Sequence, residues 1–561
     1  MARFLERSYG GVVRYFSFFI LLFLAWVSVI STSAVTLSEY IYFTEISGLP
    51  YLIILLVLIA LSVIPPVNRF IEGIDRRLSS DRKLFRILYY SLILLLLTLS
   101  VIWVVITDFR SWADSLKVQD AAMGLISGDY SEYLPQGYIG YYPHHTGLAL
   151  LESLIIKIFG VNSAIVFQLI NAVCVPLIAS ALTGFTDSNL RKLIIIGFCI
   201  LWIPLIFSTS HIYGNVPGLA SALWGYSLLF DSVEKCSKKP GIASALFIAF
   251  ACLVKENYLI FLIAYCLLCV LMFIEKKRSH SLVIALIAVM AFVLFSAVVN
   301  HITEGIIDSE LADGVSKWSY IAMGMEEGYR APGWCNDFNM ESYRASGYDT
   351  ELQSIMAKAE IRARIRELVS HPAYTLDFYV KKLASQWNEP TFQTVWNLRG
   401  HDHELPSFVN YIVSIYGSFR MIPYFKFFET VIYVAAFFFV CFEHRPDAKS
   451  LLLLTTFIGG VLFHLLWEAK AQYALFYFVL LIPVAMNGCG ALRRCLNGLA
   501  VSKKAGEEDN GSRKDGVSFK GVIVCVLLFV LFLGVLYYLR IPTGLTGGSL
   551  PYYEYIVRNS I

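Results

Sequence analysis

Long apolar segments alternate with short polar ones along most of this chain, and the pattern predicts membrane-spanning helices. A helix needs roughly 20 residues to cross about 30 Å of hydrocarbon, and most of the apolar segments approach that length. Soluble proteins instead show amphipathic helices with charged faces. The expected spans are 14–33, 49–66, 86–107, 162–184, 193–209, 218–232, 241–254, 258–274, 282–299, 424–442, 450–467, 473–490 and 521–540. The sequence therefore predicts an all-α polytopic membrane protein with about thirteen transmembrane helices.

The composition agrees with a membrane protein. Of the 561 residues, 57% are hydrophobic and 16% are charged, whereas an ordinary soluble domain has about 45–50% and about 25%. The formal net charge of +3 is nearly neutral and gives no indication of nucleic-acid binding. The first span has no small-residue cleavage site and further spans follow it, so we interpret it as a retained helix.

Lysine and arginine residues indicate the orientation, because they accumulate in cytoplasmic loops. If the spans alternate, all the basic clusters fall on one side of the membrane. These clusters are Arg3, Arg7 and Arg14; Arg69, Arg76, Arg77, Arg82 and Lys83; Arg191 and Lys192; Lys235, Lys238 and Lys239; Lys276, Lys277 and Arg278; and Arg493, Arg494, Lys503, Lys504, Arg513 and Lys514. We expect a multi-pass protein of the cell membrane with a cytoplasmic N-terminus and an external C-terminus.

Two long polar segments then fall on the external side, and both are expected to contain short helices. In the second, Ile361, Ile365 and Leu368 follow helical spacing, and a proline at 372 ends that helix. The predicted organisation is an N-terminal end with three spans (1–107), a first external loop (108–161), six spans (162–299), a large external unit (300–423), three spans (424–490), a cytoplasmic linker (491–520), and a last span with an external tail (521–561).

The first external loop carries three candidate general bases, Asp108, Asp114 and Asp120, just beyond the third span. A carboxylate beside apolar neighbours can have a raised pKa and accept a proton during catalysis. Each could equally be a solvated loop acid. Residues 115–127 have helical spacing and end at Gly-Asp, and a tyrosine-rich run then leads to the Pro-His-His at 143–145.

This order of features resembles the first external loop of GT-C fold glycosyltransferases, in particular bacterial family 39-like or mannosyltransferase-like members. Five further segments resemble motifs of that group in the same order. They are HIYGNVPG (211–218), LVKENYLI (253–260), KWSYIAMGMEEGYRAPGWCNDFN (317–339), LASQWNEPTFQTVW (383–396) and WEAKAQYALFYFVLLIP (467–483). The resemblance touches most of residues 105–490.

The chain also departs from the group. An arginine commonly precedes the tyrosine of the last motif, but here Gln472 stands there, with Lys470 two positions earlier. The simplest members have one helix before the catalytic loop, whereas three are expected here. The first two spans and the last one are therefore interpreted as additions to the bundle or as a permutation of it.

The resemblance implies transfer of a sugar from a polyprenyl-phosphate-linked donor to an acceptor hydroxyl on the external face, with inversion. The acceptor would be a glycan, a lipid or a protein of the cell envelope. Asp114 occupies the place of the group's loop aspartate and is the expected base, with Asp108 and Asp120 as alternatives. Some relatives use a divalent cation, but nothing in the sequence marks a metal site and no cofactor is assigned.

Lys255 and Lys470 are the candidate ligands of the donor phosphate, because the leaving phosphate needs cations in a low-dielectric site. A lysine between apolar spans is costly unless it is paired or used, although either could be an interfacial lysine that reaches water. His144 and His145 could bind the phosphate or orient the acceptor, or lie at the surface.

Aromatic residues and a further acid are candidate sugar contacts. Tyr142, with Tyr138 and Tyr141, could form either an aromatic belt at the headgroup level or a platform for substrate. Trp387 and Glu389 could contact the sugar, or instead pack the external unit on the membrane helices.

Two other functions fit a protein with many spans. A transporter or flippase of lipid-linked saccharides would be expected to show an internal repeat and short loops, which the sequence lacks. A polysaccharide polymerase or ligase would be expected to rely on external Arg/His pairs rather than on an aspartate after an early helix.

Overall fold

The structure is a computed structural model that describes residues 2–276, 279–398, 403–443, 445–502 and 544–560, together with residues 534 and 538. Within these ranges the α-helices are α1 (Ala2–Ile30), α2 (Leu49–Ser62), α3 (Pro65–Ser80), α4 (Arg82–Thr107), α5 (Ala113–Ser127), α6 (Tyr138–Tyr141), α7 (Thr146–Phe159), α8 (Ser163–Thr183), α9 (Asn189–Leu201), α10 (Pro204–Phe207), α11 (Asn215–Lys235), α12 (Lys238–Val254), α13 (Leu259–Lys276), α14 (Ser279–Ile307), α15 (Lys317–Met325), α16 (Phe338–Ala345), α17 (Thr350–Ser370), α18 (Pro372–Trp387), α19 (Ser407–Val413), α20 (Ile415–Phe442), α21 (Ala448–Leu466), α22 (Ala471–Ser502) and α24 (Ser549–Ser560).

Short 3-10 helices and one hairpin complete the regular structure of the described residues. The 3-10 helices are η1 (Ser131–Tyr133), η2 (Pro143–His145), η3 (Gly160–Asn162), η4 (Ser208–Ser210), η5 (Glu256–Tyr258) and η6 (Trp396–Leu398). Strands β1 (Thr32–Val35) and β2 (Ile41–Thr44) pair antiparallel, with Thr32 opposite Thr44. The fold is therefore a helical bundle with one small hairpin after its first helix.

Eight segments of the described residues are long and apolar enough to cross a membrane, or up to ten if each of two bent helix pairs is one span. The eight are Ser8–Ile30, Arg82–Thr107, Pro143–Thr183, Glu256–Ile274, Ser279–Ile307, Ile415–Phe442, Ala448–Leu466 and Ala471–Asn497. The bent pairs are α2 with α3, at 85°, and α9 with Pro204–Ser210, at 61°. By length and composition this is a multi-pass membrane protein.

The predicted count of thirteen spans is not confirmed. Helices form at the expected 218–232 and 241–254, but α12 has only 17 residues and α11 begins with the polar and small residues NVPG. These two helices pack on each other, and α11 also packs on α8. Except for residues 534 and 538, the expected span at 521–540 lies outside the described residues.

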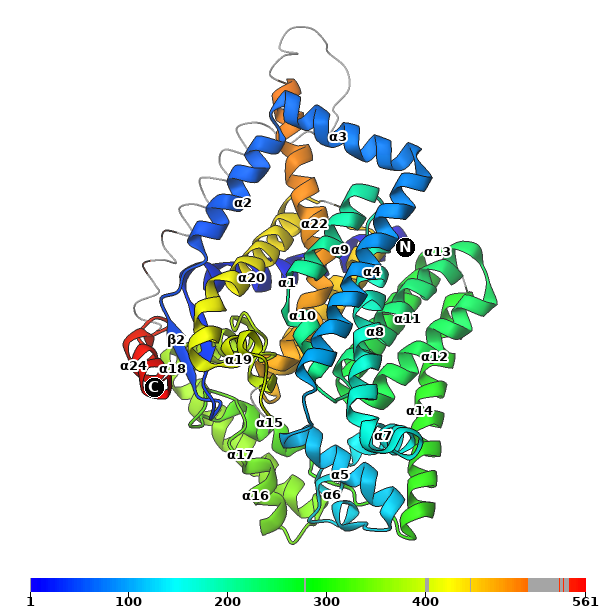
Figure 1. Cartoon of the computed structure of the whole chain (residues 1–561), viewed down its shortest axis with the longest axis vertical. Coiled ribbons are helices and arrows are strands. Elements are labelled where there is room, and N and C mark those ends of the chain that lie inside the picture. Colours follow the sequence, from blue (N-terminus) through cyan, green and yellow to red (C-terminus); the bar gives the residue numbers. More distant parts are fainter. Residues whose placement is uncertain are drawn as a thin grey trace.

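Polar loops gather at two opposite ends of the bundle (Figure 1). Helices α5, α6, α7, α15, α16 and α17 lie at one end, and α3 and the far end of α22 lie at the other. Basic side chains meet at the α3 end, where Arg493 Nε donates to Asn68 Oδ1 at 3.1 Å and Arg191 Nη1 donates to Asn487 Oδ1 at 2.6 Å. Basic loops that are distant in sequence therefore share one end of the molecule, and we expect that end to face the cytoplasm.

The N-terminal helix and hairpin are integral to this bundle. Helix α1 packs on α20 and α21. In the hairpin, Ser33 N donates to Asn388 O at 2.9 Å, and Ile41 N donates to Arg330 O at 3.2 Å. The first span, which the sequence suggested could be an addition, thus holds the hairpin against loops of the large external unit.

The short helices expected in the external segments are present. Helix α5 ends at Gly128, whose φ of 85° is the left-handed conformation that glycine adopts without strain. Helix α17 ends before Pro372, and α18 runs from there to Trp387. These helices surround one end of the bundle and place loop side chains over its apolar interior.

Candidate functional site

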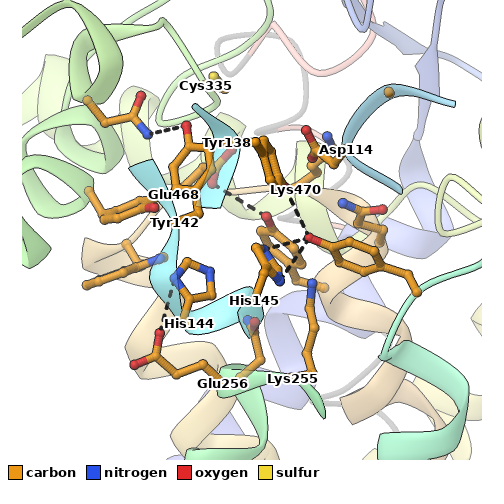
Figure 2. A pocket seen from close by; sticks show the side chains of 18 of the residues that line it. Asp114, Tyr138, Tyr142, His144, His145, Lys255, Glu256, Cys335, Glu468 and Lys470 are labelled. Atoms are coloured by element: carbon orange, nitrogen blue, oxygen red, sulfur yellow. Dashed lines mark hydrogen bonds and ion pairs between the residues drawn. The ribbon is translucent and has the colours of Figure 1, made fainter. Parts of the chain in front are cut away.

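A cavity of about 620 Å³ lies at the end of the bundle where α5, α6 and α15 gather. Its walls come from segments far apart in sequence: the start of α5, the run from α6 to η2, the loop before α11, η5, the 330–340 loop, and the residues between α21 and α22. Asp114, Tyr142, His144, His145, Lys255 and Lys470 all line it (Figure 2). The structure thus brings together six of the eight residues predicted from the sequence.

Asp114 lies in the first turn of α5 and lines the cavity. Its carboxylate makes no hydrogen bond or ion pair with any described residue. The alternative bases are engaged elsewhere: Asp108 pairs with Arg110 at 3.3 Å, and Asp120 pairs with Lys117 at 3.5 Å. Neither of these two lines the cavity, so position separates Asp114 from the other two aspartates.

Lys255 is buried in the wall that faces Asp114 (Figure 2). It lies in extended conformation between α12 and η5, and its ammonium is 4.0 Å from the centre of the Tyr213 ring. Among the described residues it has no ion-pair partner, so its contacts in the cavity are aromatic. Burial lowers the pKa of Lys255 to about 7.

Direct contact between two of the sequence motifs, HIYGNVPG and LVKENYLI, positions Lys255. A Cβ added at Gly214 would lie 2.0 Å from the carbonyl oxygen of Val254, and one added at Gly218 would lie 2.2 Å from the Tyr258 ring. The two glycines therefore allow the HIYGNVPG and LVKENYLI segments to approach each other closely. Tyr213, from the first motif, is held beneath Lys255, from the second.

Lys470 lies in a different electrostatic environment. Its ammonium is 3.0 Å from Glu39 Oε1, and Glu39 Oε2 is 3.2 Å from Arg330 Nε. Burial alone would lower the pKa of Lys470, but the charges of Glu39, Asp114 and Glu468 outweigh it and raise the pKa. Burial likewise opposes ionisation of Glu39, and the two cations nevertheless hold its pKa below the usual value. Lys470 is thus a fixed cation.

The two histidines have different partners. His144 Nδ1 is 3.8 Å from Glu256 Oε2, and Glu256 is also paired with Lys317 at 2.7 Å. His145 is buried, and its Nε2 is 2.7 Å from the hydroxyl of Tyr213. His145 therefore lines the cavity and also holds the ring on which Lys255 rests.

The tyrosine-rich run surrounds the cavity instead of forming a belt on the outer surface. Tyr138 and Tyr142 line the cavity, and the Tyr142 hydroxyl accepts a hydrogen bond from Asn339 Nδ2 at 3.4 Å. Tyr141 is buried, and its hydroxyl accepts from Arg344 Nε at 2.8 Å. Burial raises the pKa of Tyr142. Of the two roles expected for these tyrosines, the positions of Tyr138 and Tyr142 favour a wall of this cavity.

Trp387 and Glu389, expected as sugar contacts, do not line the cavity. Trp387 is fully buried, and the centre of its ring lies 5.7 Å from the ring centre of Phe457 and 5.9 Å from that of Tyr477. Glu389 is buried and accepts a hydrogen bond from the backbone N–H of Gln393 at 2.6 Å. Their positions correct the expectation in favour of its alternative: the QWNEP segment packs the external unit on the membrane helices.

Sequence reasoning missed the partners of Lys470. Glu39 lies in the short hairpin after the first helix, where no function was expected. Arg330 lies in the GYRAPGW part of the motif at 317–339. Gln393 Nε2 also donates to Glu39, at 3.1 Å. These groups come from three distant parts of the chain, so spacing could not connect them. The arginine within a glycine-rich motif was the one available signal.

Glu468, two positions before Lys470 in the sequence, also lines the cavity. Burial raises the pKa of Glu468 to about 7, against the opposing charge of Lys470. In the part of the chain that the structure describes, no group of three or more His, Cys, Asp or Glu side chains is arranged to hold a metal ion.

No family model matches the chain, and no curated protein matches it. Among solved structures, the chain is similar to the archaeal oligosaccharyltransferase AglB from Archaeoglobus fulgidus, in complex with an inhibitory peptide and a dolichol-phosphate. The two share 13% sequence identity with a TM-score of 0.37, over 81% of this chain and 55% of that one. The chain thus spans about half the length of that protein.

Proposed function

We propose that the protein is a membrane glycosyltransferase that moves a sugar from a polyprenyl-phosphate-linked donor to an acceptor hydroxyl on the external face. One observation carries the proposal: a carboxylate, Asp114, and a lysine, Lys255, neither of which has an ion-pair partner among the described residues, line one cavity at the end of an apolar helical bundle. Sugar transfer from a phosphate requires a base for the acceptor and a cation for the leaving group, and these two side chains supply them.

Asp114 acts as the general base. Its carboxylate accepts the proton of the acceptor hydroxyl while that oxygen attacks the anomeric carbon of the donor sugar. The bond between the anomeric carbon and the phosphate oxygen breaks on the opposite face, so a single displacement inverts the anomeric configuration. The absence of a partner within the described chain leaves the carboxylate free to face an acceptor.

The leaving phosphate is stabilised by the cations of the cavity. In the described part of the chain no carboxylate lies at ion-pair distance from Lys255, and Lys470 and Arg330 share the single negative charge of Glu39. Lys255 on one wall of the cavity, and Lys470 with Arg330 on another, therefore present positive charge to a bound anion. Held in place before the reaction, these cations need no reorganisation as charge develops on the phosphate, which is the source of electrostatic catalysis.

An apolar surface leads from the cavity toward the lipid. Leu259 and Ile260, in the first turn of α13, line the cavity together with Phe463 of α21. Further along α13, Ile263 is 59% exposed and Leu267 is 44% exposed. A polyprenyl chain could lie on this surface while its phosphate reaches Lys255. The proposed donor therefore matches both the charged and the apolar walls.

Replacement of Asp114 tests the proposal, with Asp120→Asn as the matched control on the same helix. The purified protein would be supplied with radiolabelled farnesyl-phosphoryl hexoses and pentoses and with envelope material from cells lacking the protein as acceptor. Asp114→Asn should reduce the rate of transfer by about 10²–10⁴-fold, the usual contribution of a general base, whereas Asp120→Asn should transfer normally.

Transfer at the normal rate by Asp114→Asn would show that the base is wrongly assigned. If wild-type protein in vesicles moves a labelled lipid-linked sugar across the membrane but never transfers it, the protein is a transporter and the enzyme proposal fails.

A further inference from the structure

Two lysines line the same cavity with opposite surroundings. Lys470 has a carboxylate partner, Glu39, at 3.0 Å. Lys255 has no ion-pair partner among the described residues and rests on the ring of Tyr213 at 4.0 Å, with the ring of Tyr473 at 5.8 Å. Both lysines were expected from the sequence to be ligands of the donor phosphate. Their different contacts in the structure indicate different roles.

We propose that Lys255 is the proton donor to the departing phosphate, while Lys470 serves only as a fixed cation. This rests on the proposed function. As the acceptor oxygen bonds to the anomeric carbon, the bond from that carbon to the phosphate oxygen breaks, and its electron pair stays on the phosphate. The phosphate oxygen takes a proton from the Lys255 ammonium, and Asp114 holds the acceptor proton. The cycle closes when Asp114 releases its proton to water and Lys255 takes one up.

Contact between the Lys255 ammonium and the Tyr213 ring is compatible with a lysine that gives up its proton. An aromatic face attracts an ammonium through its quadrupole, but it carries no full negative charge and cannot accept the proton. The Tyr213 hydroxyl is fixed 2.7 Å from His145 Nε2 and 3.4 Å from the Tyr138 hydroxyl. The ring therefore holds Lys255 in place while its N–H groups remain available to a ligand in the cavity.

The acid–base balance of the two lysines agrees with these roles. Burial lowers the pKa of Lys255 to about 7, whereas Glu39 and the neighbouring acids raise the pKa of Lys470. A phosphate monoester has its second pKa near 6, so proton transfer from Lys255 is nearly balanced. Opposite shifts within one site separate the group that exchanges a proton from the group that keeps its charge.

Charges on every surrounding element act on Lys255. The carboxylates of Asp114 and Glu468 favour its charged form, and Lys470 opposes it. The other titratable groups that face it are His144 and His145 from η2, His211 and Tyr213 from the loop before α11, Glu256 from η5, Lys317 from α15 and Tyr473 from α22. A bound phosphate adds negative charge to this set, so the pair formed by Lys255 and the product phosphate should gain one proton when the phosphate binds to neutral Lys255.

Calorimetry of the wild-type protein with farnesyl phosphate tests this directly, without an acceptor. Titrations at pH 8 in buffers of different ionisation enthalpy give the number of protons taken up on binding. The wild-type protein should take up close to one proton per site, because Lys255 is mostly neutral before binding. Lys255→Arg is always charged and should bind without proton uptake. Lys381→Arg, on α18 outside the cavity, should behave like wild type.

The possible outcomes distinguish the inference from the proposed function. Binding by the wild-type protein without proton uptake would overturn the role of Lys255 and leave the glycosyltransferase proposal intact. Equal uptake by Lys255→Arg and wild type would do the same. Failure of the wild-type protein to bind farnesyl phosphate would overturn both. Transfer rates give a second readout: wild-type activity should fall as the pH rises through about 7, whereas Lys255→Arg, which keeps its charge and cannot give up a proton, should transfer slowly and without this decline.

Discussion

At the scale of single residues, Lys382 shows how a charged side chain can organise the site without lining it. It is fully buried in α18, and its ammonium donates to the carbonyl oxygens of Leu465, at 3.0 Å, and Trp467, at 2.8 Å, and also to that of Gly324. Burial lowers the pKa of Lys382 to about 7. These bonds join the end of α15 to the segment that carries Glu468 and Lys470.

We therefore predict that Lys382→Met destabilises the protein by about 2–4 kcal/mol, because three carbonyl groups lose their donor. The measurement is thermal unfolding in detergent, followed by loss of helical circular dichroism. Lys381→Met is the matched control, since Lys381 is partly exposed and pairs with Asp377 at 2.7 Å. The control should change stability by less than about 1 kcal/mol. Equal unfolding of the two variants would contradict this role of Lys382.

At the scale of elements, the site depends on how closely two breaks between helices approach each other. The loop before α11 meets the break between α12 and α13, and Gly214 lies against the carbonyl of Val254. Each break interrupts an apolar segment with polar residues, which is costly in a membrane unless the backbone groups find partners. Lys255 N donates to Ala251 O at 3.1 Å and Tyr258 N donates to Lys255 O at 3.1 Å, so this break is stabilised internally.

Gly214→Ala should consequently displace Lys255 from its position over the Tyr213 ring. The added Cβ would lie 2.0 Å from a backbone oxygen, so one of the two segments must move. We expect weaker binding of farnesyl phosphate, by at least about tenfold, and a lower unfolding temperature. Gly197→Ala, in α9, places the new Cβ more than 4 Å from any described atom outside the local backbone of its own helix and its chain neighbours, and should be neutral or stabilising by roughly 0.5–1 kcal/mol. Unchanged binding by Gly214→Ala would show that the approach is not required.

At the scale of the whole molecule, the cluster of basic residues and the cavity lie at opposite ends of the bundle (Figure 1). The cavity lies among α5, α6 and α15, whereas the basic residues of α9 and α22 meet near α3. If basic loops face the cytoplasm, the cavity opens to the external face. A lipid-linked donor would then be used on the side of the membrane where envelope acceptors are found.

Cysteine labelling should reveal this orientation. Cys236, exposed in the turn between α11 and α12, belongs to the basic end, and a cysteine introduced at Glu351 in α17 would lie at the cavity end. In right-side-out vesicles a membrane-impermeant maleimide should label Glu351→Cys and leave Cys236 unlabelled until the membrane is permeabilised. The reverse pattern would invert the orientation and place the proposed transfer on the cytoplasmic face.

The sequence by itself determined the helical membrane character, the short helices α5 and α17, and six of the residues that line the cavity. Apolar length and local helix-stop residues encode these features within a few turns of chain, so they can be read without a fold. The number of spans was harder to predict, because α2 and α9 form bent pairs and α11 and α12 are shorter or more polar than a free span requires.

The tertiary structure alone decided which candidates act together. The resemblance favoured Asp114 among three aspartates, but only the fold shows that Asp114 lines the cavity and that the other two pair with basic neighbours. Lys255 and Lys470 were equivalent in the sequence, and only the hairpin that delivers Glu39 makes one a fixed cation. The reason is physical: the charge state and availability of a side chain depend on partners within a few ångströms, and these partners come from parts of the chain hundreds of residues apart.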